Sequence, residues 1–380
     1  MIGPISDLLR AMLASNATRC LLPSAIALFS ASCQPAAPET PGPGIDPTAI
    51  SPETPVWELL VALGETAPEH IREGFTEAQV QRGYELVTSG KTPHPETGIL
   101  TERLSAYFYC TDCHTSVREE SSLRSLSDPE AKIAYATENG LPLLPGTTFA
   151  GIVNRSSWYN GDYARKYRFS PSVRRARKSL TAAIILCTEQ CSQGRSPETW
   201  EVEAMLAYFW SLQWKLGDLG LRGADIAEWK RRAINPDEHE TLRQEIRARF
   251  VSASPATFGA MPEDPVAGYQ VDSPPSPDRG KQVWERTCLH CHGAEGASEH
   301  FFGDKEATWK SLSRKFRTAS SKSVYGYLRL GTHPEDEKKA YMPNYTRERL
   351  SDQQIEDLRS YIEERAGSDE SAPADSTGTE

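Results

Sequence analysis

The chain has 380 residues, a formal net charge of −10 at neutral pH and a hydrophobic content of 38%. This length suits two domains of ordinary size with linkers between them. No uncharged apolar run is long enough to cross a bilayer, and the acidic balance argues against nucleic acid as a partner.

Residues 1–33 predict a secretory signal. Arg10 and Arg19 precede an apolar stretch at residues 20–31, and small residues follow it, which is typical of a signal peptide. The segment ends at Cys33, and this ending resembles a lipoprotein box, in which the cysteine becomes the lipid-bearing N-terminus. Ordinary cleavage nearby is the alternative. We therefore expect a protein in the periplasm or on the outer side of a bacterial membrane, anchored there through Cys33.

Residues 34–66, rich in proline and glycine at their start, predict a linker. The first domain is expected at residues 67–220. It carries a Cys-x-x-Cys-His motif at Cys110, Cys113 and His114. Two thiols at this spacing add across the two vinyl groups of one haem, and the adjoining histidine becomes a ligand of its iron.

Helices are expected on both sides of this first motif. One covers residues 78–87 and includes Gly83, and the other begins with Ser196 as N-cap and Pro197 as its first residue. Met205 lies inside the second helix at an apolar position, which favours core packing. No methionine precedes this helix, but Cys187 and Cys191 do.

Three interpretations of these two cysteines remain open. In the first, one of them binds the first iron as a thiolate, and Cys187 is preferred over Cys191 for this role. In the second, the two form a disulfide in an oxidising compartment. In the third, one is a free thiol that takes part in sulfur chemistry. Cys187 is also the candidate catalytic residue if a sulfur anion is oxidised at the first haem.

A basic run stands out in this acidic chain, since no acid occurs between Asp162 and Glu189. It should attract small anions or an acidic protein partner. The alternative is a solvated loop in which some arginines pair with haem propionates. The run consists of Arg165, Lys166, Arg168, Arg174, Arg175, Arg177 and Lys178.

Residues 221–276 predict a second linker, helical and charged at first and then rich in proline. The second domain is expected at residues 277–366, where Gly280, Trp284 and Cys288 fall on one face of a helix that leads into Cys291 and His292, the end of a second Cys-x-x-Cys-His motif.

The last helix of this domain should begin at a capping box of Ser351 and Gln354, and apolar residues then follow at helical spacing. The whole segment resembles class I cytochrome c. That resemblance implies a distal iron ligand shortly before the last helix, which is Met342 here, with His300 and His333 as weaker rivals. The tail at residues 367–380 is acidic and expected to be disordered.

Residues 75–215 are loosely similar to thiosulfate dehydrogenases and related tandem dihaem cytochromes. In these a cysteine precedes a loop of Arg-Ser-Met-Asn-Gly type and ligates the catalytic haem. Cys187 takes that place here, nine residues before Ser196, as Met342 lies nine residues before Ser351. Cys191 and Ser192 replace the serine and methionine of that loop.

The expected protein is mainly α, with two cytochrome c-like haem domains joined by a helical and proline-rich linker. It would hold two c-type haems with iron and pass electrons from the first to the second, exchanging them with redox proteins, some of them membrane-bound. The alternative function is oxidation of a small sulfur anion at the first haem.

Two further alternatives are weaker. A dihaem peroxidase also has two such motifs, but its expected connecting stretch of Pro-Tyr-Met-His-Asp-Gly type is missing. A zinc site shared by the two cysteine pairs would not explain why each pair ends in histidine.

Overall fold

The regular structure of the chain is helical, as the sequence predicts. The computed structural model describes residues 46, 49–70, 74–298, 300–333 and 340–368, and among them it has only isolated β-bridges and no strand. Residues 42–380 form one compact unit. The predicted signal segment, the lipidation residue Cys33 and most of the acidic tail lie outside the described residues.

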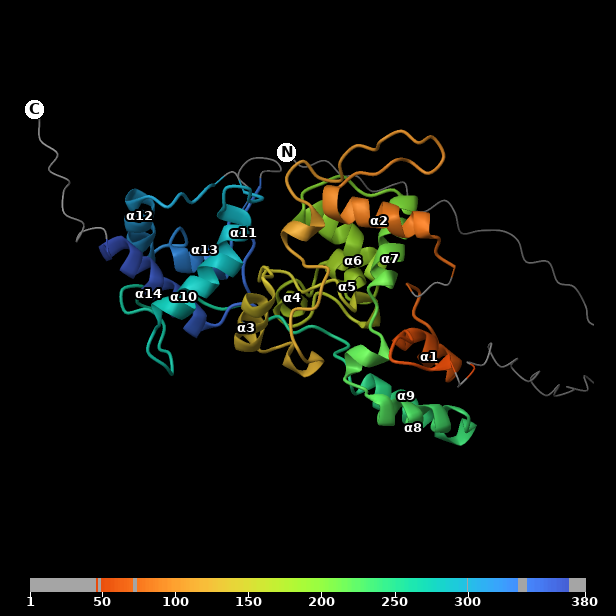
Figure 1. The fold of residues 1–380 in the computed structure, drawn as a ribbon. Coiled ribbons are helices and arrows are strands. Elements are labelled where there is room, and N and C mark those ends of the chain that lie inside the picture. Colours follow the sequence, from red (N-terminus) through yellow and green to blue (C-terminus); the bar gives the residue numbers. More distant parts are fainter. Residues whose placement is uncertain (1–45, 47–48, 71–73, 299, 334–339, 369–380) are drawn as a thin grey trace, which may run out of the picture. The chain divides into compact units, whose positions relative to one another are not determined.

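Two helices of the first region cross at very short range (Figure 1). Helix α2 (Glu77–Ser89) begins at a capping box formed by Thr76 and Gln79, and α7 (Thr199–Ser211) packs across it. A Cβ atom on Gly83 would lie 1.9 Å from the carbonyl oxygen of Ala204. Only glycine therefore permits this approach.

The second region repeats this crossing with α10 (Pro277–Val283) and α14 (Asp352–Ser368) (Figure 1). A Cβ atom on Gly280 would lie 1.9 Å from the carbonyl oxygen of Asp357. The predicted capping box is confirmed, since Ser351 Oγ accepts from the Gln354 amide at 3.0 Å and Gln354 Oε1 accepts from the Ser351 amide at 3.0 Å.

The predicted start of α7 was wrong by two residues. Its N-cap is Glu198, not Ser196, because the Glu201 carboxylate accepts the Glu198 amide at 2.8 Å. Glu201 is fully buried and also binds the Arg195 guanidinium. This reciprocal pairing sets the start of the helix in place of the Ser-Pro pair. Cys187 and Met342 therefore do not lie at the same distance in sequence from the N-caps of α7 and α14.

The two predicted linkers form a third hydrophobic core instead of free connections. Helix α1 (Val56–Ala62) lies inside residues 34–66, and α8 (Gly223–Ala233) and α9 (His239–Arg247) lie inside residues 221–276. Their apolar faces pack on one another. The charged, amphipathic pattern of α8 and α9 reflects this packing, because one face of each is buried.

The predicted boundary between the two haem domains also differs from the packing. Helix α3 (Pro129–Asn139), from the expected first domain, contributes Ile133 and Ala136 to the core of the second region. Gln354 donates to the carbonyl of Pro129 at 2.8 Å. Helix α3 therefore belongs structurally to the second region.

The remaining helices are short. They are α4 (Asp162–Lys166), α5 (Pro171–Ala176), α6 (Leu180–Leu186), α11 (Leu289–His292), α12 (Glu306–Phe316) and α13 (Val324–Leu330), with 3-10 turns at Cys110–Asp112, Leu123–Ser125, Ile152–Asn154, Leu216–Leu219 and Pro236–Glu238, and π-turns at Cys187–Cys191 and Trp284–Cys288.

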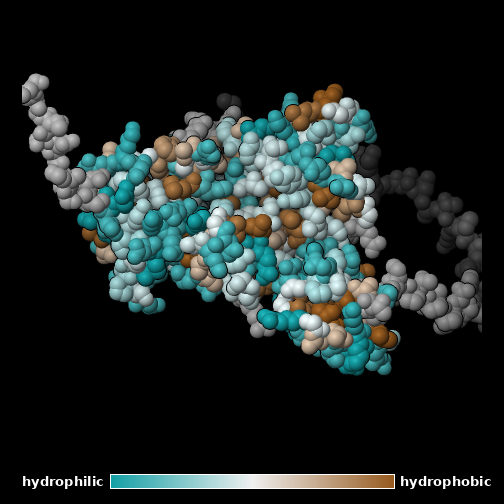
Figure 2. All heavy atoms as spheres, in the orientation of Figure 1, coloured by the Kyte–Doolittle hydropathy of each residue, from teal (hydrophilic) through white to brown (hydrophobic). Residues whose placement is uncertain are grey.

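The face drawn in Figure 2 is mainly hydrophilic, with hydrophobic residues scattered over it. Within the part of the chain that the structure describes, no helix is both long enough and apolar enough to cross a membrane.

Candidate haem-binding sites

The second motif lies where a π-turn meets a short helix. The turn Trp284–Cys288 continues α10 and runs into α11, which carries Cys291 and His292. The His292 Nδ1–H donates to the carbonyl of His300 at 2.6 Å, and the ring stacks on Phe302 with centroids 4.2 Å apart. These contacts fix the ring and leave Nε2 for a metal.

The first motif holds its histidine in the same way. The His114 Nδ1–H donates to the carbonyl of Thr147 at 2.7 Å, and the ring stacks on Phe149 with centroids 4.7 Å apart. Gly146 makes this approach possible, because a Cβ atom there would lie 2.4 Å from His114 Cε1. Nε2 of His114 is again left for a metal.

The four motif cysteines are free, half-buried thiols. Burial raises the pKa of Cys110 and Cys288 to about 12 and that of Cys291 to about 11. The pKa of Cys113 is also raised, by burial and then by the nearby Cys291 thiol. All four are therefore protonated at neutral pH. Thiols and histidines in this arrangement fit the donor set that a c-type haem requires.

Met342 packs against the core of the second region. Its side chain and that of Cys288 pack against the same hydrophobic core. Two hydrogen bonds to Thr332 hold the Met342 backbone, from its amide to Thr332 Oγ1 at 2.7 Å and from the Thr332 amide to its carbonyl at 2.8 Å. The rivals His300 and His333 have exposed side chains.

Cys187 and Cys191 lie one turn apart in the π-turn that extends α6. Both are free thiols, so the structure does not contain the disulfide considered above. A hydrogen bond from the Cys187 thiol and one from the Tyr159 hydroxyl, 3.9 Å from the sulfur, lower the pKa of Cys191, although burial opposes this. Cys187, the donor, has a raised pKa.

This pair of thiols lies near the first motif. The thiols of Cys110 and Cys113 are close enough to contribute to the raised pKa of Cys187. The structure thus brings together the residues that the sequence proposed around the first haem. Met205 is buried in the core of the first region, as predicted, and is not part of the group.

Tyr341 was missed by the sequence reasoning, although it adjoins Met342. Its ring meets that of Phe108 edge-on with centroids 5.6 Å apart, and Phe108 comes two residues before Cys110. Burial, followed by the nearby Cys191 and Cys113 thiols, raises the pKa of Tyr341. Tyr341 of the second region therefore approaches the first motif.

The two motifs also approach each other directly. Burial lowers the pKa of His290, while the nearby Asp112 carboxylate and the backbone of Thr111 oppose this. The Cys291 thiol raises the pKa of Cys113. His290 and Thr111 are the variable residues inside the motifs, so the two attachment turns lie against each other.

A buried ion pair joins the two regions beside the first motif. Arg349 binds Glu119 through two hydrogen bonds of 2.5 and 2.9 Å, and their side chains are only 4% and 3% exposed. Burial raises the pKa of Glu119, but the Arg349 guanidinium outweighs it and holds that pKa below its usual range. A second buried pair, Lys132 with Glu120 at 3.0 Å, lies in the same neighbourhood.

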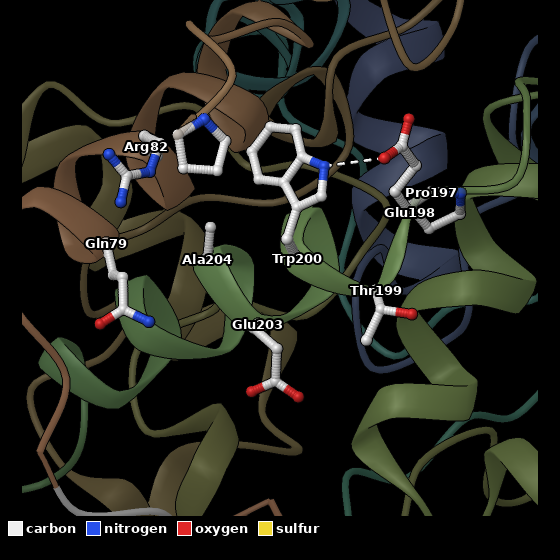
Figure 3. Close-up of a pocket in the computed structure, with 9 residues that line it drawn as sticks. Gln79, Arg82, Pro197, Glu198, Thr199, Trp200, Glu203 and Ala204 are labelled. Atoms are coloured by element: carbon white, nitrogen blue, oxygen red, sulfur yellow. Dashed lines mark hydrogen bonds between the residues drawn. The ribbon is translucent and has the colours of Figure 1, made fainter. Parts of the chain in front are cut away.

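A surface hollow of about 760 Å³ opens where α2 meets the start of α7 (Figure 3). Arg82 on α2 and Glu203 on α7 line it, and the Trp200 indole donates to Glu198 at 2.8 Å. None of its lining residues belongs to either motif, so this hollow is separate from the candidate haem sites.

The zinc alternative requires several ligands in one place. Among the described residues, no three histidine, cysteine, aspartate or glutamate side chains come together in a way that could hold a metal ion.

Comparison with known families identifies the second region. Residues 277–366 match the cytochrome c family model and form a cytochrome c domain. No curated protein matches the chain. A cytochrome c domain implies at least one c-type haem and electron transfer through it, and it indicates an extracytoplasmic location. This match confirms the prediction of a cytochrome c domain at residues 277–366.

Proposed function

We propose that the chain is a dihaem c-type cytochrome of the periplasm, which takes up electrons at the first motif and delivers them from the second. The observation that carries this proposal is the repeated setting of the two histidines. His114 and His292 each donate from Nδ1 to a backbone carbonyl, and each stacks on a phenylalanine. A bound haem supplies a one-electron iron couple at each place.

The helix crossings support the same proposal. In both regions a glycine of the first helix lies against the last helix. A Cβ atom added at Gly83 in α2 or at Gly280 in α10 would lie 1.9 Å from a carbonyl oxygen of that last helix. The first region therefore uses the helix packing found in the cytochrome c domain, although the family model matches only residues 277–366.

The chain's residues have distinct proposed roles. Cys110 and Cys113 attach one haem, and Cys288 and Cys291 attach the other. Met342 is the proposed sixth ligand in the second region. Sulfur of a thioether opposite histidine raises the reduction potential, so electrons should collect in this region.

Cys187, with Cys191 as the alternative, is the proposed sixth ligand in the first region. A thiolate donates electron density to iron and lowers the potential. Transfer from the first region to the second is then downhill. The contact between the attachment turns, through His290 and Thr111, supports a short route between them.

The haem content tests the proposal. A pyridine haemochrome assay on the purified chain should give two covalent haems. The variant Cys110→Ala with Cys113→Ala should keep one, and the matched variant Cys288→Ala with Cys291→Ala should also keep one. A single haem in the wild type, unchanged by the first pair of substitutions, would contradict the proposal.

A second function is oxidation of thiosulfate or a related sulfur anion at the first motif. The hydrogen-bonded thiols of Cys187 and Cys191 beside that motif favour it. Two thiosulfate ions would join through a new sulfur–sulfur bond and release two electrons, which the two iron centres together can hold.

Single variants separate the two functions. If the second function holds, thiosulfate reduces the wild-type haems, and Cys187→Ala or Cys191→Ala abolishes this together with the low-spin thiolate signal in electron paramagnetic resonance. Absence of any reduction by thiosulfate in the wild type rejects it and leaves the electron-transfer function standing.

The cellular site is part of the same proposal. Lipidation at Cys33 would tether the cytochrome to the outer side of a membrane and bring it close to membrane-bound redox proteins. Metabolic labelling with palmitate should mark the wild type and leave the Cys33→Ser variant unlabelled.

A further inference from the structure

Seven exposed cations form a surface on and beside α4 and α5, here called the basic surface. Among the described residues, only one of these cations forms an ion pair, which joins Arg165 to Asp162. The whole chain carries a net charge of −10, so this surface has the opposite sign to the chain as a whole. Its members are Arg165, Lys166, Arg168, Arg174, Arg175, Arg177 and Lys178.

Two exposed aromatic rings lie among these cations. Phe169 is 76% exposed, and Tyr167 is 41% exposed. The Arg168 guanidinium lies 4.6 Å from the centre of the Phe169 ring, and the Lys166 ammonium lies 5.5 Å from that of Tyr167. Arginine and aromatic residues are enriched in protein interfaces, so this composition is typical of a docking surface.

Three tyrosines connect the basic surface to the first motif. Tyr167 stacks on Tyr163 with centroids 6.4 Å apart, and Tyr163 meets Tyr159 edge-on at 5.8 Å. The Tyr159 hydroxyl lies 3.9 Å from Cys191 Sγ. A continuous series of contacts therefore runs from an exposed ring to the thiol pair.

The exposure of the cations favours a large partner over a small anion. An exposed ion pair contributes only about 0–1 kcal/mol, because water and salt screen it. A small anion can contact few of these side chains at once. An extended acidic surface can contact most of them, and the summed field also steers its approach.

We propose that the basic surface docks an acidic one-electron donor protein and that the tyrosine series provides the short route to the first motif. One electron leaves the reduced donor, which becomes oxidised, and a ferric iron at the first motif becomes ferrous. This inference rests on the proposed dihaem function and names the class of its donor.

Stopped-flow reduction by a plant-type ferredoxin, an acidic electron-transfer protein, tests the docking. The second-order rate constant for the wild-type holoprotein should fall at least about tenfold from low to high salt. The variant Arg174→Gln with Arg175→Gln should be about tenfold slower at low salt, with a weaker salt dependence.

The matched control is Arg314→Gln with Lys322→Gln. It removes two exposed cations from the second region and should leave the ferredoxin rate unchanged. Equal rates for the two double variants would overturn the docking proposal. Dithionite should reduce two haems in every variant, and failure of this control in the wild type would count against the dihaem function instead.

The same variant distinguishes two other ligands of the basic surface, a membrane and a small anion. If the Arg174 and Arg175 variant loses only binding to vesicles of phosphatidylglycerol and phosphatidylcholine, the surface is a membrane contact and the proposal fails. If it loses only reduction by thiosulfate, the surface serves a small anion and the proposal also fails.

The tyrosine route has its own variant. Tyr167→Leu keeps the charge and should lower the reduction rate at saturating ferredoxin while leaving the salt dependence intact. An unchanged saturating rate would overturn the route.

Discussion

The regions around Cys110 and Cys288 place their histidines alike but complete their sites differently. Both use a carbonyl acceptor and a stacked phenylalanine for the histidine. Before the last helix, however, one region has a π-turn with two thiols and the other a loop with Met342. In the proposed function, the shared frame would position a haem in each region, and the short variable segment would supply its sixth ligand.

This difference explains why one chain would carry both regions. Two identical sites have no preferred direction for an electron. With the proposed ligands, a thiol pair on one side and a thioether on the other would separate the two potentials. The frame can stay constant, because the choice of sixth ligand needs only a few residues of one segment.

The largest expected effect concerns the joint between the regions. Arg349→Met leaves the Glu119 carboxylate buried without its cation, and breaking such a pair costs about 3–5 kcal/mol. Guanidinium chloride unfolding of the holoprotein should show this loss. Arg317→Met, which removes an exposed partner of Glu363, should cost at most about 1 kcal/mol.

A double variant separates charge from packing. Glu119→Gln combined with Arg349→Met removes both charges and should recover part of the lost stability, because neither member of the pair remains buried as an uncompensated ion. If Arg349→Met alone is as mild as Arg317→Met, the two regions are not held together by this pair.

The next effect tests whether the two helix crossings are equivalent. An added Cβ atom would lie 1.9 Å from a carbonyl oxygen at Gly83 and at Gly280. Each glycine-to-alanine variant should lose stability toward the upper end of about 1–3 kcal/mol for overpacking. Gly223→Ala, with no atom within 4 Å of its Cβ, is the control. If Gly83→Ala keeps the wild-type stability and Gly280→Ala does not, the two helix crossings are not equivalent.

Absorption spectra can test whether the two regions have different sixth ligands. Met342→Ala should remove the far-red band of methionine-bound ferric haem and lower the higher of the two potentials. Cys187→Ala should leave that band in place. Loss of the band in Cys187→Ala, or its survival in Met342→Ala, would contradict the separate assignments.

Local patterns were sufficient for the features that depend on adjacent residues. The capping box of Ser351 and Gln354 and the helix around Gly83 were predictable, because each follows from spacing within a few residues. The start of α7 was not, because Glu201 also binds Arg195 and this pairing outweighs the local Ser-Pro pattern.

Long-range partners account for the rest. Nothing near Arg349 in the sequence indicates Glu119, and nothing near Pro129 indicates that α3 joins the core of the second region. Helix α1 was not predicted, because it lies in a segment whose proline-rich start resembles a linker. Tyr159 and Tyr341 carry no motif, and only the fold brings them to the thiols.

The smallest expected effect is a pH dependence that arises at His70 in the first region. Buried His70 donates from Nε2 to the carbonyl of Val153 at 3.0 Å and meets Trp158 edge-on. Burial lowers its pKa below 6.5. As pH falls below 6.5, the unfolded chain binds a proton there before the folded one does, so the free energy of unfolding falls. The second region instead buries Arg329, which is paired with Asp352.

Hydrogen exchange from about pH 8 to about pH 5 can resolve this difference, since histidine titrates in that window. After correction for intrinsic exchange, amides of α7 should lose protection in acid more than those of α14. His70→Gln keeps a donor for Val153 and should remove most of the difference. If both regions weaken equally in the wild type and in His70→Gln, the acid sensitivity lies at the joint, where burial also lowers the pKa of His290, and not in the first region.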